Sequence, residues 1–146
     1  MAKDFFGVTY TLRNEVKHFR CRVYRQAEDA KDIDELTERW GRVLDAEGKF
    51  QAQKVDVECL LGADIVDRVD RVSDCLHDLD IAVQAKRRDI KSGGENFKSN
   101  KDFALKIRRM LTHFPYEQDE LDKNIEAAVK SIKDKLEPHV VGKAST

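Results

Sequence analysis

Apolar residues recur along most of the chain every three or four positions, which is the spacing of one face of an α-helix. The clearest run consists of Leu61, Ile65, Val69, Val72, Leu76, Leu79 and Val83. Shorter runs with the same spacing lie at 12–23, 33–50, 103–114 and 121–136. A helix with a single apolar stripe needs partners to bury that stripe. The pattern therefore predicts an all-α protein, folded as an elongated antiparallel bundle of four to five helices.

Glycines mark the uncertain points in the first half of the chain. The first helix is expected over about 4–29. A start near Thr11 is the alternative, because Gly7 and the β-branched residues after it are poor helix formers. In the second helix Gly48 either ends the helix or lies inside it at a cost of about 1 kcal/mol relative to alanine.

No strong helix breaker occurs between residues 50 and 91, and Gly62 is the only weak point. We therefore expect one very long helix over about 50–91, which at about 1.5 Å per residue would span about 60 Å. Such a helix would make the bundle elongated. The sequence leaves open whether residues 33–91 form one helix or two.

Stop signals are clearer in the last third of the chain. The clearest loop is expected at 92–96, where two glycines follow a serine. Ser99 or Asn100 is placed to cap the next helix, which Pro115 should end. Pro138 should end the last helix.

Composition supports a helical domain. Charged residues make up 38% of the chain, well above the roughly 25% of an average domain, and 7 glycines with 2 prolines supply few turns. The 146 residues suit a single domain over 1–146, with a tail that frays from about residue 139. The three cysteines, Cys21, Cys59 and Cys75, match neither a disulfide framework nor a zinc motif. With no secretory signal and no membrane-length apolar run, we expect a soluble protein in the cytoplasm.

Charge is distributed in blocks although the net charge is only −1. Residues 13–25 and 86–109 are basic, and residues 28–80 and 117–122 are acidic. One interpretation is that these blocks neutralise each other inside the bundle. The other is an exposed basic face that binds an acidic partner or anionic lipid, whereas nucleic acid is not expected because no aromatic residues are interleaved with the cations of 86–91. The residues of this face would be Arg13, Lys17, Arg20, Arg22, Arg25, Lys86, Arg87, Arg88, Arg108 and Arg109.

Two carboxylate–histidine pairs have the spacing of ligands in dimetal helical bundles: Glu15 with His18, and Asp74 with His77. Three of these four residues are predicted to point away from the core, so two solvated pairs are the preferred interpretation. Phosphate-binding loops, nucleophile elbows and metal-protease motifs are not found. We therefore expect no enzyme activity, cofactor or metal, with a metal-dependent enzyme built on the two pairs as one alternative.

The first predicted helix combines aromatic residues with basic neighbours, as membrane-surface helices do. Its aromatic residues are Phe5, Phe6, Tyr10, Phe19 and Tyr24. The same residues can serve as core anchors, which is the preferred interpretation. A membrane-active or anionic-lipid-binding domain led by this helix is the alternative function.

Residues 35–44 resemble part of the third helix of a spectrin repeat, which often carries a Leu-x-x-Arg-Trp-x-x-Leu-like run. The resemblance covers about ten residues, and the roughly 30 residues before it are too few for the two long helices that a repeat would need. The similarity is one of helical chemistry, and it implies that Trp40 is a large core anchor.

The leading functional prediction is a non-enzymatic interaction, adaptor or scaffolding domain that binds a protein partner through charged helix faces. Self-association is a further expectation, since a very long helix can leave apolar residues uncovered by its own chain. The residues that lie beside or off the main stripe, and are therefore candidates for a second surface, are Val55, Val57, Leu60 and Ile81.

Overall fold

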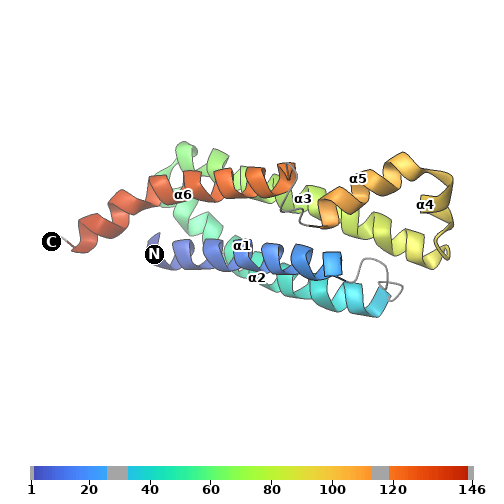
Figure 1. Ribbon diagram of the computed structural model, residues 1–146. Helices are drawn as coiled ribbons and strands as arrows, with labels where there is room; N and C mark the ends of the chain where they lie inside the picture. The colour runs from blue at the N-terminus through green and yellow to red at the C-terminus, as the bar shows by residue number, and fades with distance from the viewer. Residues whose placement is uncertain (1, 26–32, 113–118, 145–146) are drawn as a thin grey trace.

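The structure is a computed structural model that describes residues 2–25, 33–112 and 119–144, shown in Figure 1. Within these ranges the chain forms six α-helices and no strand. The helices are α1 (Ala2–Arg25), α2 (Ile33–Leu61), α3 (Ala63–Lys91), α4 (Glu95–Ser99), α5 (Lys101–Leu111) and α6 (Glu120–Ala144). The all-α prediction is confirmed, and the short α4 brings the number of helices above the four to five expected.

Four of the helices form a ring in which α1 packs against α2 and α6, and α3 packs against the same two helices. α3 and α6 run in opposite directions, because Asp64 lies near Lys135 and Arg68 lies near Ser131. Neighbouring helices in the ring are therefore antiparallel. α4 and α5 fold back along the C-terminal half of α3, at the end of the molecule opposite the two termini (Figure 1). The result is the elongated bundle that was predicted.

The predicted apolar stripes form the core. Every member of the run from 61 to 83 is buried except the half-buried Leu61. In the neighbouring helices, Phe5 stacks on Phe50 with 5.2 Å between the ring centres, and Phe19 lies against Trp40 at the same separation. Trp40 is buried, as the helical pattern around it implies.

The very long helix predicted over about 50–91 is wrong, because the chain reverses at Gly62. This residue has φ 76° and ψ −161°, a backbone conformation that only glycine adopts readily. Its N–H still donates to the carbonyl oxygen of Glu58 at 2.9 Å and so completes the last turn of α2. Gly48, by contrast, lies inside α2. The reversal lets α3 bury its stripe against α2 of the same chain.

The remaining helix ends agree with the sequence only in part. Asn100 caps α5, where its side-chain oxygen accepts the Phe103 N–H at 3.1 Å, as predicted. Pro138 does not end α6, because a proline removes one hydrogen bond and bends a helix without necessarily terminating it. The fraying expected from about residue 139 stays a prediction. Pro115 and the expected end of the first helix near residue 29 lie outside the described residues.

Candidate functional site

The basic face predicted from the sequence includes one residue that the fold buries. Arg20 in α1 is only 1% exposed. Its guanidinium donates to the carbonyl oxygens of Arg109, Met110 and Thr112 at 3.0, 2.8 and 2.8 Å, and to the carboxylate of Asp119 at 2.9 Å. The last carbonyl groups of a helix accept no hydrogen bond from that helix, and a guanidinium can donate to several of them at once. The prediction that Arg20 contributes to an exposed face is therefore wrong.

Two further members of the predicted basic face lie on α1 and are paired with α6. Arg13 and Lys17 both contact the carboxylate of Glu126, at 3.4 and 2.5 Å, and Arg13 also lies 4.7 Å from the centre of the Tyr10 ring. The side chains of Arg13, Lys17 and Glu126 are all partly buried where α1 and α6 pack together. The side chains of Arg22 and Arg25 lie outside the described part of the structure. Arg13, Lys17 and Arg20 of the predicted face are therefore neutralised within the bundle.

Lys86 and Arg87, at the C-terminal half of α3, are half-buried. The ammonium group of Lys86 lies 5.4 Å from the centre of the Phe97 ring, and Phe97 in turn meets Phe103 at 6.1 Å. These contacts attach α4 and α5 to α3. They give Lys86 a structural role at this end of the molecule, whereas the side-chain Nε of Arg87 is buried without a hydrogen-bond partner.

The remaining cations of this region are exposed, and we call them the basic end. They are Arg88, Lys91, Lys101, Lys106, Arg108 and Arg109. None of them forms an ion pair within the described residues. Of the acidic residues nearby, Glu95 pairs with Lys98 at 3.9 Å, and the buried Asp89 accepts the Phe97 N–H at 2.8 Å. Asp102 is exposed on α5 itself, where it is one carboxylate against four cations. The basic end is thus a concentration of positive charge that the fold leaves available to a partner.

Apolar side chains accompany the exposed cations on α5. Leu105 is 47% exposed and Phe103 is 40% exposed. Phe103 was expected in the apolar stripe of this helix, but it is only partly covered, by Phe97 of α4. The exposure of Leu105 has a signal in the sequence, since Leu105 falls on the face opposite the buried Ile107.

The four residues predicted to form a second apolar surface differ in exposure, and the self-association expected of them stays a prediction. Val55, Leu60 and Ile81 are exposed. Val57 is 1% exposed, so its inclusion is wrong. Val57 lies in the last turns of α2, where the reversal at Gly62 brings α3 alongside and widens the buried face.

Two ionisable groups in α2 and α3 have perturbed pKa values. Burial, followed by the nearby charges of Asp78 and Asp74, raises the pKa of the Cys75 thiol to about 11. Burial, followed by the charge of Asp80, raises the pKa of Glu47 above its ordinary value of 4.5. Burial is the larger cause of both shifts, and the carboxylates of α3 add to it.

The two carboxylate–histidine pairs are not brought together. Glu15 and His18 lie on α1, and Asp74 and His77 lie on α3, which is diagonal to α1 in the ring. Asp74, His77 and His18 are exposed. Among the described residues there is no group of three or more His, Cys, Asp or Glu side chains arranged to hold a metal ion.

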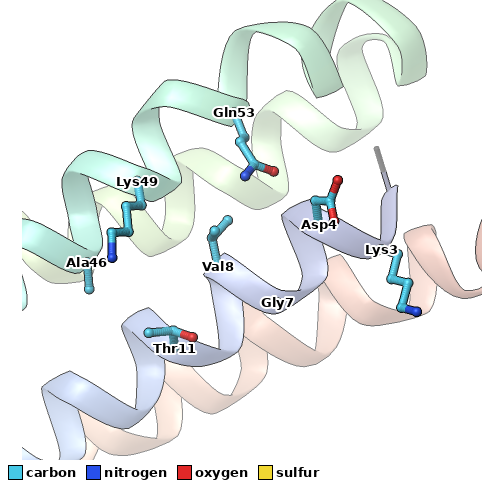
Figure 2. A pocket seen from close by; sticks show the side chains of 8 residues that line it. All are labelled: Lys3, Asp4, Gly7, Val8, Thr11, Ala46, Lys49 and Gln53. Carbon is cyan, nitrogen blue, oxygen red and sulfur yellow. The ribbon is translucent and has the colours of Figure 1, made fainter.

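A hollow in the surface lies between α1 and α2 and has a volume of about 480 Å³ (Figure 2). Gly7 and Ala46 leave the space open because they carry little or no side chain. Its lining residues are Lys3, Asp4, Gly7, Val8, Thr11, Ala46, Lys49 and Gln53. It contains no histidine or cysteine, and it lies at the other end of the molecule from α4 and α5.

The aromatic residues that suggested a membrane-surface helix belong largely to the core. Phe5 and Phe19 are buried, and the half-buried Phe6 packs edge-on against Tyr10. No helix in the described part of the chain has an apolar stretch long enough to cross a bilayer. In comparisons with protein-family models, with curated proteins and with solved structures, no match to this chain was found.

Proposed function

We propose that this chain is a non-enzymatic interaction domain that binds an acidic protein partner through its basic end, in a reducing compartment such as the cytoplasm. The observation that carries the proposal is the contrast between two sets of cations. Arg13, Lys17 and Arg20 of α1 are paired within the bundle, whereas the cations of the basic end have no described partner. The three cysteines are free thiols, which suits a reducing environment.

A folded protein suits this surface better than a bilayer does. Membrane insertion led by α1 would require Phe5 and Phe19 to leave the core, which would open the contacts between α1 and α2. The basic end, by contrast, is presented on packed helices, with Leu105 among its cations. A rigid patch of cations around one apolar side chain provides orientation and specificity toward a protein surface of opposite charge.

The proposal is tested by fluorescence anisotropy with a fluorescein-labelled peptide of about twelve glutamates as the acidic probe. Lys101→Glu/Arg109→Glu reverses two cations of the basic end. Lys123→Glu/Lys130→Glu is the matched control, because it reverses two exposed cations on α6 with the same change in net charge. We expect the first variant to bind at least about tenfold more weakly and the control to bind nearly as the unaltered chain does.

Three results would overturn the proposal. Equal loss of binding in both variants would mean that the peptide responds to net charge and not to the basic end. Binding to phosphatidylserine vesicles without binding to the peptide would favour the lipid alternative, particularly if Phe5→Asp/Phe6→Asp abolished it. Stoichiometric iron, manganese or zinc in the purified protein would favour the metal-dependent enzyme.

A further inference from the structure

The acidic residues of α3 form an exposed stripe on the first half of that helix. The acidic stripe consists of Asp67, Asp70, Asp74 and Asp78, all of them exposed. Steps of three, four and four residues place them on one side of the helix, opposite the buried Val69, Val72 and Leu76. The stripe is about 16 Å long at about 1.5 Å per residue.

Little positive charge compensates the acidic stripe. Asp70 lies 3.6 Å from Lys54, and the other three carboxylates form no ion pair in the described structure. Of the arginines between them, Arg68 is turned toward α6, where it donates to the carbonyl and hydroxyl oxygens of Ser131 at 2.6 and 2.9 Å. Arg71 is the arginine that stays exposed beside the stripe.

The basic end contains a stripe of matching size on α5. Lys101, Leu105 and Arg109 are four residues apart, so they share one side of the helix, and Arg108 adjoins them. This basic stripe is about 12 Å long and lies opposite the buried Ile107. An exposed apolar residue accompanies each stripe. Leu105 lies within the basic stripe, and Ile81, which is 52% exposed, lies one turn beyond Asp78.

We propose that the acidic stripe of a second copy of this chain is the partner of the basic stripe, so that copies associate through an α3–α5 contact between molecules. This inference rests on the proposed function and names its partner. The two stripes of one molecule cannot meet, because α5 packs along the C-terminal half of α3 (Figure 1), whereas the exposed acidic stripe lies on the N-terminal half. A net charge of −1 means that two copies do not repel each other strongly.

The contact is heterologous, because it joins two different surfaces. Every copy carries both surfaces, so association can extend beyond two molecules unless the geometry closes. Ion pairs at the edges of such a contact are sensitive to salt, whereas the Leu105 and Ile81 contacts are not. Association is therefore expected to weaken, as salt rises, over the range in which exposed charges are screened.

The experiment is sedimentation velocity on the full chain at about 200 μM, in about 50 mM and about 500 mM sodium chloride. Asp74→Lys/Asp78→Lys leaves the molecule with two basic surfaces, and Lys101→Glu/Arg109→Glu leaves it with two acidic ones. We expect the unaltered chain and the Lys123→Glu/Lys130→Glu control to exceed the monomer mass of 16.8 kDa at low salt. Each stripe variant alone should be monomeric, and an equimolar mixture of the two should associate again.

Recovery on mixing is the decisive result, since a folding defect in either variant would not produce it. An unaltered chain that stays at 16.8 kDa at low salt would overturn the inference. Self-association that both stripe variants retain would also overturn it. The glutamate-peptide measurement separates this failure from failure of the proposed function, because a monomeric chain that binds the peptide at its basic end keeps the function and loses only the partner named here.

Discussion

Arg20 of α1 and Asp119, the residue before α6, form a buried ion pair of 2.9 Å that connects α1 to the start of α6. Asp119 also accepts the N–H of Asp122 at 3.1 Å, so it caps α6. The same guanidinium holds the carbonyl oxygens at the end of α5. Positive charge at a helix C-terminus and negative charge at a helix N-terminus both complement the helix dipole. Arg20 therefore links the C-terminal end of α5 to the N-terminal end of α6.

Removing the Arg20 side chain should be strongly destabilising. We expect Arg20→Met to lower the free energy of unfolding by about 3–5 kcal/mol, because it takes the guanidinium away from the Asp119 carboxylate and from several buried carbonyl groups. Arg20→Lys should rescue it only partly, since an ammonium group cannot reproduce the planar set of donors. The control is Arg13→Met, which breaks a partly exposed pair and should cost at most about 1 kcal/mol. Urea unfolding measures both, and equal losses would refute the assigned role.

Adding a side chain should have opposite effects at two glycines of the α2–α3 hairpin. Gly62→Ala should destabilise by about 1–3 kcal/mol, because alanine is strained at the positive φ of this reversal. Gly48→Ala should stabilise by about 0.5–1 kcal/mol, because its added Cβ meets open space within a regular helix. Thermal unfolding of the two variants checks the signs. A stabilising Gly62→Ala would show that the two helices join as one.

Glu47 should make the protein less stable as pH rises, whereas a salt-bridged carboxylate makes a protein more stable as pH rises. Burial and the charge of Asp80 raise its pKa in the folded state above 4.5, so the folded state binds a proton more tightly than the unfolded state does. This proton linkage makes stability fall as pH rises from 4.5 through the folded-state pKa. Glu47→Gln should therefore raise the melting temperature at about pH 7 and change it little at about pH 4.

The matched control for Glu47 is Glu38→Gln, at an exposed position of the same helix. Its effect on the melting temperature should not show the same growth between the two pH values. A Glu47→Gln variant that is less stable than the unaltered chain at about pH 7 would contradict the direction argued here.

Cys75 should react much more slowly with iodoacetamide than the exposed Cys21 and Cys59 do. Its pKa is raised from 9.0 to about 11, so at about pH 8 its reactive thiolate fraction is roughly a hundredfold smaller, and burial slows the reaction further. Peptide mass spectrometry after timed labelling gives the three rates. Asp74→Asn/Asp78→Asn should speed the labelling of Cys75, because it removes two of the charges that raise the pKa. Equal rates at all three cysteines would show that α3 does not bury this position.

Apolar periodicity was enough to predict the core of this bundle. The runs at 12–23 and 61–83 pack as stripes, and Asn100 caps α5 as its position suggested, because spacing and capping are local properties of the chain. Whether a glycine ends a helix depends less on its local sequence. Gly48 and Gly62 have similar intrinsic preferences, but only Gly62 is a reversal, since burying the stripe of α3 against α2 requires the chain to turn there.

The sequence by itself determined that apolar stripes would be buried together and that charge would be distributed in blocks. Which cations remain free was decided only by the tertiary structure. Arg20 and Arg109 both belong to basic segments, yet one is buried against the end of α5 and the other faces solvent. The physical reason is that a charge is neutralised by groups close to it in space, and in this bundle those groups come from helices far away in the chain.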